Sequence, residues 1–488
     1  MREFRVYDTL SRELRTFRPI TPPRVGLFVC GLTPYAEAHV GHGRVAVVFD
    51  VVARALTAWG YRPLYVQNVT NVDDRLIERA AAEGTDPLAL AERHMAGWLQ
   101  AMEELGVRSV NYYPRATDYI PEIIAQVAAL VDRGFAYVAR DGSVYFDVGR
   151  FPDYGRLSGQ RVEALRPGAR LEVDPRKRAP EDFVLWKAAV PGEPSWPSPW
   201  GPGRPGWHIE DTAITGRLLG PRYDLHGGGV DLKFPHHEAE IAQAEGASGE
   251  RPFVNYWMHV GLVEMGGTKM SKSIGNVYPL RQALDEYGPW VVRFYYLNAH
   301  YRSPLGFQGS ETLDESREAY RRLAAPREAI RRARARDAGS RERDLPAGVA
   351  AGAEALVDRL DAHLADDFHT REVIAELFGW GRTVTELLAS PSGASLSDDA
   401  LDTLERPYEW AQRMLGLWPE TPPVLVGEAD ASAVIEAAIA ARARARARGD
   451  YAEADRIRHD LERAGITLED RGNETTWQSN REDAGRRP

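Results

Sequence analysis

The stretch RVGLFVCGLTPYAEAHVGHGRVAVVFDVVARALTAWGYRPLYVQNVT, residues 24–70, decides the fold of the chain. Its apolar run 24–30 predicts a buried strand, 43–59 has the pattern of a helix closed by Gly60, and 62–70 predicts a second buried strand. A strand, a helix and a strand joined by short loops form the unit of a parallel sheet, whose crossover is right-handed. We therefore expect an α/β protein with an open parallel sheet.

The rest of the chain divides by composition. Helical patterns occupy 73–83, 86–106 and 117–134, and a Pro/Gly-rich stretch, about 140–206, is expected to interrupt the sheet as an insertion. Strand-like segments resume at RYDLHGGG (222–229) and VNYWMHVGLVEM (254–265), with a helix from Pro235 between them. From about 310 onward we expect helices with a loop near 389–397, and the break WPETPPVLVG (418–427) precedes a last small unit.

The composition is that of a globular protein. The 488 residues predict about two to four domains. No run of about 18 apolar residues occurs, and the charged N-terminus does not resemble a secretion signal. A single cysteine cannot form an internal disulfide, so we expect a soluble, cytoplasmic protein without a membrane partner. The net charge of −10 argues against an extended nucleic-acid coat but leaves local basic patches open.

Polar side chains gather where the first two strands end. Cys30 ends the first strand and Thr70 the second, and ligands of open parallel sheets bind beyond these ends. His39 and His42 fall where the helix begins, and there the helix dipole and free backbone N–H groups favour a polyphosphate. Alone, this pattern is more typical of a buried thiol and two helix-capping histidines than of a ligand site.

The loop TKMSKS, residues 268–273, carries two of the five lysines in a chain that has 56 arginines among its 61 basic residues. Such a loop can close on a triphosphate and neutralise the charge of a pyrophosphate leaving group. A compact, mobile ammonium differs in this respect from a rigid guanidinium.

Together, the His-Val-Gly-His and Lys-Met-Ser-Lys-Ser motifs resemble the signatures of class I aminoacyl-tRNA synthetases. More narrowly, six stretches are similar to the cysteinyl-tRNA synthetase family: VCGLTPYAEAHVGHGR, YVQNVTNVDD, GRPGWHIED, DLHGGGVDLKFPHHEAEIAQAE, GGTKMSKSIGN and DYAEADRIRHDLERAGITLED. The resemblance runs from residue 6 to about 478. It implies a Rossmann-type catalytic domain with an inserted connective domain, an all-helical tRNA-binding bundle and a small terminal unit.

These implied parts have the following expected boundaries. We assign the first half of the catalytic domain to 1–115, the connective region to 116–205, the second half to 206–265, the lysine loop and stem-contact region to 266–320, the helical anticodon-binding bundle to 321–420, and a small tRNA-contact unit to 421–488.

The resemblance implies a zinc ion that binds the thiolate of substrate cysteine. Mapped residue by residue, its ligands are Cys30, Asp211, His236 and Glu240. Asp211 departs from the family, which usually has a second cysteine there, yet aspartate binds zinc through oxygen. His236 and Glu240 share a helix face at i and i+4, whereas His237 on the adjacent face is expected to support the site or cap the helix. The alternative is that the metal is lost and cysteine is selected by shape.

The remaining site residues also follow from the resemblance. Trp207 is the expected aromatic wall of the cysteine pocket, and Thr70 and Asp231 are expected to hold the substrate ammonium. His226 and His259 are either polar pocket groups or core histidines. The expected ATP contacts are His39, Gly41, His42, Gly228 within the triplet 227–229, Lys269, Ser271 and Lys272. Of these, His39, His42, Lys269 and Lys272 are the expected catalytic residues, and Mg²⁺ is expected to arrive with ATP.

The implied activity is that of a cysteine–tRNA ligase, with tRNA(Cys), L-cysteine and ATP as partners of a monomer. Arginine-rich segments 326–344 and 440–460 and the aromatic Trp477 are expected to meet RNA, although mixed-charge helices are often only solvated. Two alternatives stay open. One is a related cysteine ligase that acts on an amino sugar in thiol biosynthesis, and the other is a non-catalytic RNA-binding paralogue.

Overall fold

The computed structural model describes residues 1–160, 174–270, 275–335, 343–390, 393 and 395–419, and further on 439, 442–443, 446, 451, 454–455, 458, 466–471 and 474–479. These residues form two compact units, Met1–Trp418 and Pro419–Pro488. None of the described helices has the length and apolar character needed to cross a bilayer.

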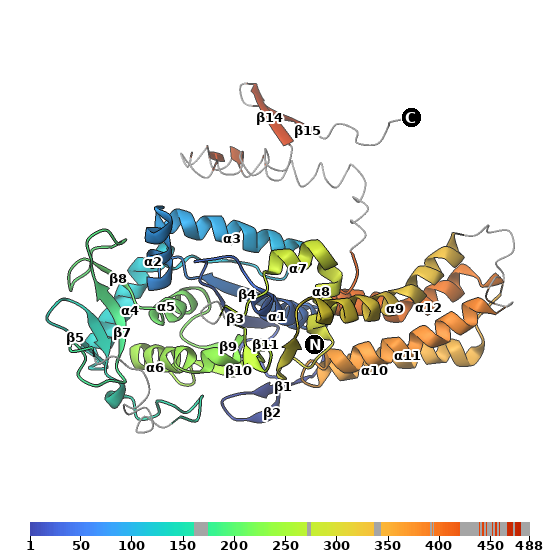
Figure 1. The fold of residues 1–488 in the computed structure, drawn as a ribbon, viewed down its shortest axis with the longest axis horizontal. Helices are drawn as coiled ribbons and strands as arrows, with labels where there is room; N and C mark the ends of the chain where they lie inside the picture. The colour runs from blue at the N-terminus through green and yellow to red at the C-terminus, as the bar shows by residue number, and fades with distance from the viewer. Residues whose placement is uncertain are drawn as a thin grey trace. The chain divides into compact units, whose positions relative to one another are not determined.

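The first unit is organised around a parallel sheet in the order β10-β9-β3-β4 (Figure 1). Its strands are β3 (Arg24–Leu32), β4 (Arg62–Val69), β9 (Tyr223–Gly229) and β10 (Val254–Val260). The first crossover helix is α1 (Val40–Ala58), and the second is α6 (His236–Ser248). Because the order reverses between β3 and β9, a ligand site is expected beyond the carboxyl ends of these two strands.

The predicted βαβ unit is present, with a helix that is buried over most of its surface. The run AVVFDVV in α1 packs between the sheet and the helices that follow it, which explains its nearly continuous apolar character. Two charged side chains in this interior, Asp50 and Arg44, have polar partners. Asp50 of α1 accepts from the buried Arg293 at 2.5 Å, and Arg44 donates to the carbonyls of Gly261 and Ser303, each at 2.7 Å.

A second sheet interrupts the first between β4 and β9. Before it come α2 (Asp74–Glu83), α3 (Pro87–Glu104), the short helix Ala116–Tyr119 and α4 (Ile120–Asp132). The inserted sheet is antiparallel in the order β5-β6-β7-β8, with strands β5 (Ala136–Val138), β6 (Val144–Phe146), β7 (Phe183–Ala188) and β8 (Gly203–Pro205) and a short helix at Val148–Arg150. The chain returns to the parallel sheet through α5 (Ile209–Leu218), and a short helix, Val230–Lys233, follows β9.

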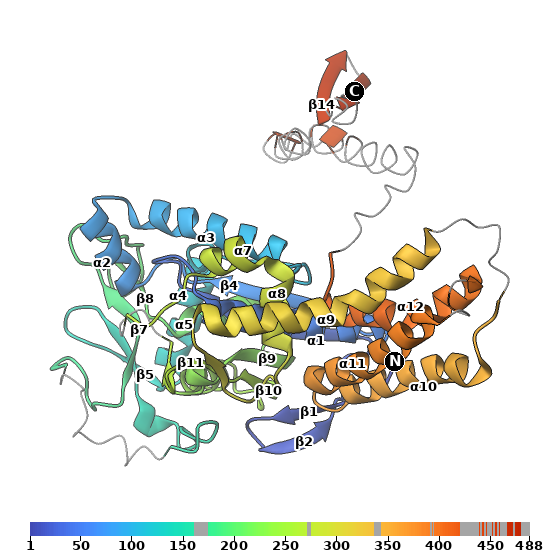
Figure 2. The same ribbon diagram turned by 45° about the vertical axis from the view of Figure 1, so that its right-hand side comes forward.

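The remaining elements of this unit are mainly helical. They are β11 (Val263–Met265), β12 (Thr268–Lys269), α7 (Leu280–Tyr287), α8 (Pro289–Leu297), β13 (Leu305–Phe307), α9 (Ser310–Arg334), α10 (Ala347–Ala365), α11 (Thr370–Ala389) and α12 (Asp398–Leu415). A hairpin of β1 (Arg5–Asp8) and β2 (Glu13–Thr16) begins the chain. Within the unit, α9–α12 form a bundle at the opposite end of the parallel sheet from the inserted sheet (Figure 2). The described part of the terminal unit contains the antiparallel pair β14 (Ile466–Arg471) and β15 (Glu474–Ser479).

Candidate active site

A cavity of about 390 Å³ lies beyond the carboxyl ends of the parallel strands. Cys30 and Thr70 line it from the ends of β3 and β4, as predicted. The sequence-predicted residues that the structure brings to this cavity are Cys30, His39, Gly41, His42, Thr70, Trp207, Asp211, Asp231, His236 and Lys269.

The two histidines of the His-Val-Gly-His motif close the start of α1. His39 is its N-cap: His39 Nδ1 accepts from the backbone N–H of Gly41 at 3.1 Å, while His42 Nδ1 accepts from the backbone N–H of His39 at 3.1 Å. The two rings lie 3.8 Å apart between centroids. Because each Nδ1 accepts, the proton of each neutral ring is on Nε2, which can donate to an anion. The capping role and the anion-binding role are therefore compatible.

The Cys30 thiol lies in a buried cluster of metal-ligand side chains. Its Sγ is 3.3 Å from Asp211 Oδ2 and 3.7 Å from Glu240 Oε1. His236 Nε2 lies 3.0 Å from Asp211 Oδ2 and 3.1 Å from Glu240 Oε1. One ligand atom from each of these four residues falls within 4.8 Å of the others. The structure thus gathers the four residues named from the sequence.

A second group overlaps with the first. His237 Nε2 lies 3.0 Å and His226 Nε2 3.4 Å from Cys30 Sγ, and with Glu240 they form another possible set of four among the described residues. The sequence prediction kept His237 outside the ligand group, because neighbouring helical residues point about 100° apart. Cys30 nevertheless lies near both faces, since its Sγ is within 4.8 Å of a ring nitrogen of His236 and of His237. His226 contacts the thiol from β9, and His259 supports His237 Nδ1 at 2.8 Å.

Burial of this cluster shifts the pKa values of its titratable side chains. Burial first, and then the nearby Glu240 and Asp211, raise the pKa of the Cys30 thiol well above its ordinary value. Burial and Asp211 likewise raise the pKa of Glu240. Burial lowers the pKa of His226 and His237, and lowers that of His259 to about 3. These shifts disfavour the charged forms. A bound cation would favour the thiolate of Cys30 and the carboxylate of Glu240, and would keep the histidines neutral.

The donor set fits a metal ion of the zinc type. Thiolate, imidazole and carboxylate are the donors that zinc takes in proteins. Glu240 Oε2 is buried and makes no hydrogen bond, so the group contains an acceptor that the protein itself leaves unsatisfied. The residues present therefore fit a cation at this position.

The other predicted cysteine-pocket residues have partners of their own. Trp207 stacks on His236, with ring centroids 4.6 Å apart, and borders the cavity as a wall. Thr70 donates its hydroxyl to the buried Glu210, a residue that the sequence analysis did not single out. Asp231 Oδ2 accepts from Lys269 Nζ at 2.5 Å, which joins the beginning of the lysine loop to the pocket.

Three predicted ATP contacts are not placed at the cavity by the structure. Ser271 and Lys272 lie outside the described residues. Gly228 is buried in β9, where a Cβ would come within 2.9 Å of the His237 ring, so its lack of a side chain accommodates His237. Gly229, the next residue, lines the cavity instead.

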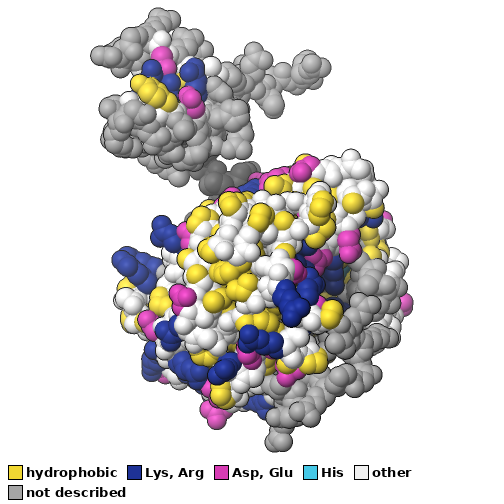
Figure 3. Space-filling view, turned by 90° about the vertical axis from the view of Figure 1, so that its left-hand side faces the viewer, with side chains coloured by type: hydrophobic (Ala, Val, Ile, Leu, Met, Phe, Trp, Pro, Cys, Tyr) yellow, Lys and Arg dark blue, Asp and Glu magenta, His cyan; other side chains and the backbone are white. Residues whose placement is uncertain are grey.

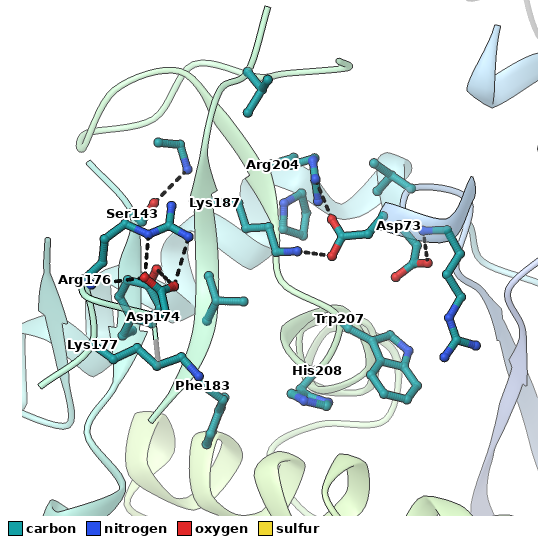
Figure 4. A pocket seen from close by; sticks show the side chains of 18 of the residues that line it. Asp73, Ser143, Asp174, Arg176, Lys177, Phe183, Lys187, Arg204, Trp207 and His208 are labelled. Atoms are coloured by element: carbon teal, nitrogen blue, oxygen red, sulfur yellow. Dashed lines mark hydrogen bonds and ion pairs between the residues drawn. The ribbon is translucent and has the colours of Figure 1, made fainter. Parts of the chain in front are cut away.

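A second cavity, of about 620 Å³, adjoins the first and shares Thr33, Arg75 and Trp207 with it. It lies between α2 and the inserted sheet (Figure 4). Asp74 binds both Lys187 of β7 and Arg204 of β8, and Arg176 binds Asp174 at 2.8 Å. On the face shown in Figure 3, Lys and Arg side chains occur in several groups among apolar patches.

Two family models and many named proteins are similar to this chain. The family model "tRNA synthetases class I (C) catalytic domain" matches residues 16–318, and "Cysteinyl-tRNA ligase anticodon binding domain" matches 428–477. A protein of Methylococcus capsulatus named "Cysteine--tRNA ligase" is 45% identical over 480 residues, covering 97% of this chain and 99% of that protein. One of Alkalilimnicola ehrlichii with the same name is 46% identical over 478 residues, with the same coverage.

The chain belongs to the cysteinyl-tRNA synthetase family.

Solved structures of other synthetases share the fold. Methionyl-tRNA synthetase of Mycobacterium tuberculosis, in complex with methionyl-adenylate, aligns with a TM-score of 0.60 at 16% identity, over 80% of this chain and 92% of that one. Leucyl-tRNA synthetase of Agrobacterium radiobacter aligns with a TM-score of 0.56 at 12% identity, over 82% and 84%. The class I fold predicted for this member of the cysteinyl-tRNA synthetase family is confirmed. Its anticodon-binding match falls in the terminal segment rather than in the 321–420 bundle to which we assigned that role.

Proposed function

We propose that the chain is a cysteine–tRNA ligase that activates L-cysteine with ATP and transfers it to the 3′ end of tRNA(Cys). One observation carries this proposal: the only cysteine of a cysteinyl-tRNA synthetase family member lies in a buried metal-ligand cluster at the cavity that His39 and His42 also line. The class I family membership supports the adenylation chemistry.

The ATP side of the cavity supplies positioning and positive charge. The N-terminus of α1 and the Nε2–H groups of His39 and His42 would hold phosphate oxygens. The substrate carboxylate attacks the α-phosphorus, the bond to the bridging oxygen breaks, and pyrophosphate leaves. Lys269 and Lys272 would neutralise the charge that builds on this leaving group. No protein nucleophile is required, so the chain acts by orientation and electrostatics.

The cysteine side supplies selectivity. We assign the metal as zinc, held by Cys30, Asp211, His236 and Glu240. When bound, zinc would prefer the soft thiolate of cysteine to the hydroxyl of serine, a difference that a hydrogen-bonding pocket separates poorly. Trp207 would bound the side-chain pocket, and Asp231 would accept from the substrate ammonium.

Transfer to tRNA needs a route for a single-stranded 3′ end. The cavity beneath the inserted sheet adjoins the reaction cavity, and its lining includes the cations Arg75, Arg176, Lys177, Lys187 and Arg204. Three of these are paired with Asp74 or Asp174, so phosphates of the 3′ end would compete with these carboxylates for the cations. The terminal ribose hydroxyl would then attack the activated carbonyl, and AMP would leave. We assign recognition of the anticodon to the segment 428–477, and we expect a cytoplasmic monomer.

The deciding experiment is amino-acid-dependent ATP–pyrophosphate exchange across the standard amino acids, with the metal content measured before and after chelation. Cysteine-only exchange that is lost on chelation and restored by zinc would support both the activation step and the metal. Cysteine-dependent exchange that continues after chelation would overturn the metal assignment and favour selection of cysteine by the shape of the pocket. No exchange with any amino acid would favour the non-catalytic paralogue.

A second assay separates tRNA from an amino sugar as the acceptor. Charging of tRNA(Cys) transcript would support the ligase, whereas transfer of cysteine only to an amino sugar would support the alternative. The terminal unit favours tRNA, because its matched segment is described as an anticodon-binding domain.

A further inference from the structure

Asn68 is a buried residue of β4 whose amide joins two parts of the cysteine side of the site. Its Oδ1 accepts from the backbone N–H of Gly31 at 2.6 Å, and its Nδ2 donates to Asp211 Oδ1 at 2.5 Å. The same Nδ2 lies 3.3 Å from Glu210 Oε1. One side chain thus contacts both the residue after Cys30 and the residue that departs from the family pattern.

Because of this contact, the two carboxylate oxygens of Asp211 have different partners. Oδ1 is held by Asn68, while Oδ2 lies 3.3 Å from Cys30 Sγ and 3.0 Å from His236 Nε2. A carboxylate can bind a cation through either oxygen or both, and can rotate between these modes. With Oδ1 occupied, Asp211 offers a single donor atom to the cluster, as a thiolate does.

The backbone around Asn68 keeps the amide in this position. A Cβ at Gly31 would lie 1.7 Å from the carbonyl oxygen of Asn68, so β3 and β4 approach too closely at this point for any side chain. The hydrogen bond to Gly31 fixes the orientation of the amide, because Oδ1 must face the N–H and Nδ2 must face Asp211. The hydrogen bond from Gly31 therefore orients the Asn68 amide, and this amide in turn donates to Asp211.

We propose that Asn68 is a positioning residue that restricts Asp211 to one oxygen toward the metal, and so lets an aspartate replace a cysteine ligand. The inference rests on the proposed metal function. Hydrogen-bonding partners of metal ligands typically change metal affinity about 10- to 100-fold when removed. The contribution of Asn68 should therefore depend on whether residue 211 is an aspartate.

The test is a double-mutant cycle on the full chain with Asn68→Ala, Asp211→Cys and the double variant. The readouts are zinc affinity by competition with a chelating dye and the visible absorption spectrum of the Co²⁺-loaded protein. We expect Asn68→Ala to weaken zinc binding at least about tenfold and to shift the Co²⁺ bands. In the Asp211→Cys background, Asn68→Ala should weaken zinc binding less than about threefold, because a thiolate has no second oxygen that Asn68 could hold.

A second variant separates positioning from folding. Asn68→Leu keeps the approximate size of the side chain but has no group that can donate to Asp211. Weakened zinc binding in this variant, while the apo chain still unfolds cooperatively, would support the proposal. Normal zinc binding by Asn68→Leu would overturn it.

The two proposals fail differently. A wild-type chain that binds neither zinc nor Co²⁺ would overturn the metal assignment and this inference with it. If the wild-type chain binds the metal, and Asn68→Ala weakens zinc binding equally whether residue 211 is an aspartate or a cysteine, only the proposed role of Asn68 is overturned.

Discussion

Lys269 Nζ lies 2.5 Å from Asp231 Oδ2, so the first lysine of the Lys-Met-Ser-Lys-Ser motif is paired with the carboxylate expected to receive the ammonium of cysteine. Each partner is thereby kept from its proposed substrate contact. Cysteine binding would replace Lys269 at Asp231 and release the lysine toward the phosphates. Under the proposed function, the pair would link the cysteine and ATP sites through a competition for one carboxylate.

Asp231→Asn should separate these effects. We expect the KM for cysteine to rise about 10- to 100-fold, since a charge-assisted hydrogen bond contributes about 1.5–3 kcal/mol. ATP affinity measured without cysteine should improve a few-fold at most, because both side chains are partly exposed and such pairs are weak. Calorimetric titration of ATP with and without cysteine checks this coupling. Lys269→Ala is the matched control, and an equal rise in the cysteine KM in that variant would contradict the competition.

Lys177→Ala should weaken the use of tRNA without affecting activation. Lys177 lines the cavity beneath the inserted sheet, and loss of one phosphate contact is expected to lower kcat/KM for tRNA about three- to tenfold and its salt slope by about 1. ATP–pyrophosphate exchange should stay at the wild-type rate. Arg178→Ala is a suitable control because Arg178 lies over the Tyr137 ring at 4.0 Å. Equal losses of tRNA charging in both variants would argue against the proposed RNA path.

Asp50→Asn should destabilise the first unit by about 3–5 kcal/mol at neutral pH, since it leaves the buried Arg293 without its counter-charge. Burial alone would raise the pKa of Asp50, but Arg293 and Arg54 outweigh burial and lower it. The stabilisation is therefore complete above about pH 4 and declines as the pH falls through the lowered pKa. Thermal unfolding of wild type and variant at pH 7 and at pH 3, below the ordinary pKa of an aspartate, measures this difference.

The control for this effect is the exposed pair of Arg18 and Glu3. Glu3→Gln should leave the thermal unfolding temperature unchanged at both pH values, because solvent screens the pair. A loss of stability in Asp50→Asn that stays constant down to pH 3 would show that the effect is one of packing rather than charge.

Removal of residues 419–488 should uncouple the two half-reactions. The remaining 1–418 is a compact unit that contains the reaction cavity, so cysteine-dependent exchange should persist near the wild-type rate. The charging of tRNA(Cys) should fall more than about 100-fold in kcat/KM, because several base and phosphate contacts are lost together. Charging at the full rate would show that the terminal unit is dispensable for tRNA recognition.

The parallel sheet and its neighbouring helices could be predicted because each has a strong local pattern. The strand ending at Cys30, the helix α1 and the strand ending at Thr70 all fall within a few residues of their predicted bounds. The helices α9–α12 and the inserted sheet also follow from periodicity and Pro/Gly content. The bounds of the six proposed regions remain predictions.

The site could be predicted only in part from the sequence, because its contacts depend on strand register. Phe28 of β3 pairs with His226 of β9, and this register carries His226 to the Cys30 thiol. No local pattern reveals such a pairing between residues about 200 positions apart. Asn68 and Glu210 lie within two of the quoted stretches but were not singled out, because their contacts join elements that are distant in the sequence.

The solitary thiol also has a consequence for oxidation. Zinc sites built on two cysteines can expel the metal as their sulfurs join in a disulfide. Cys30 is buried and has no second cysteine in the chain with which to couple. With Asp211 in the position of the second sulfur, oxidation of Cys30 would give a sulfenic acid rather than an internal disulfide, so an external thiol would have to reduce it before a metal could bind again.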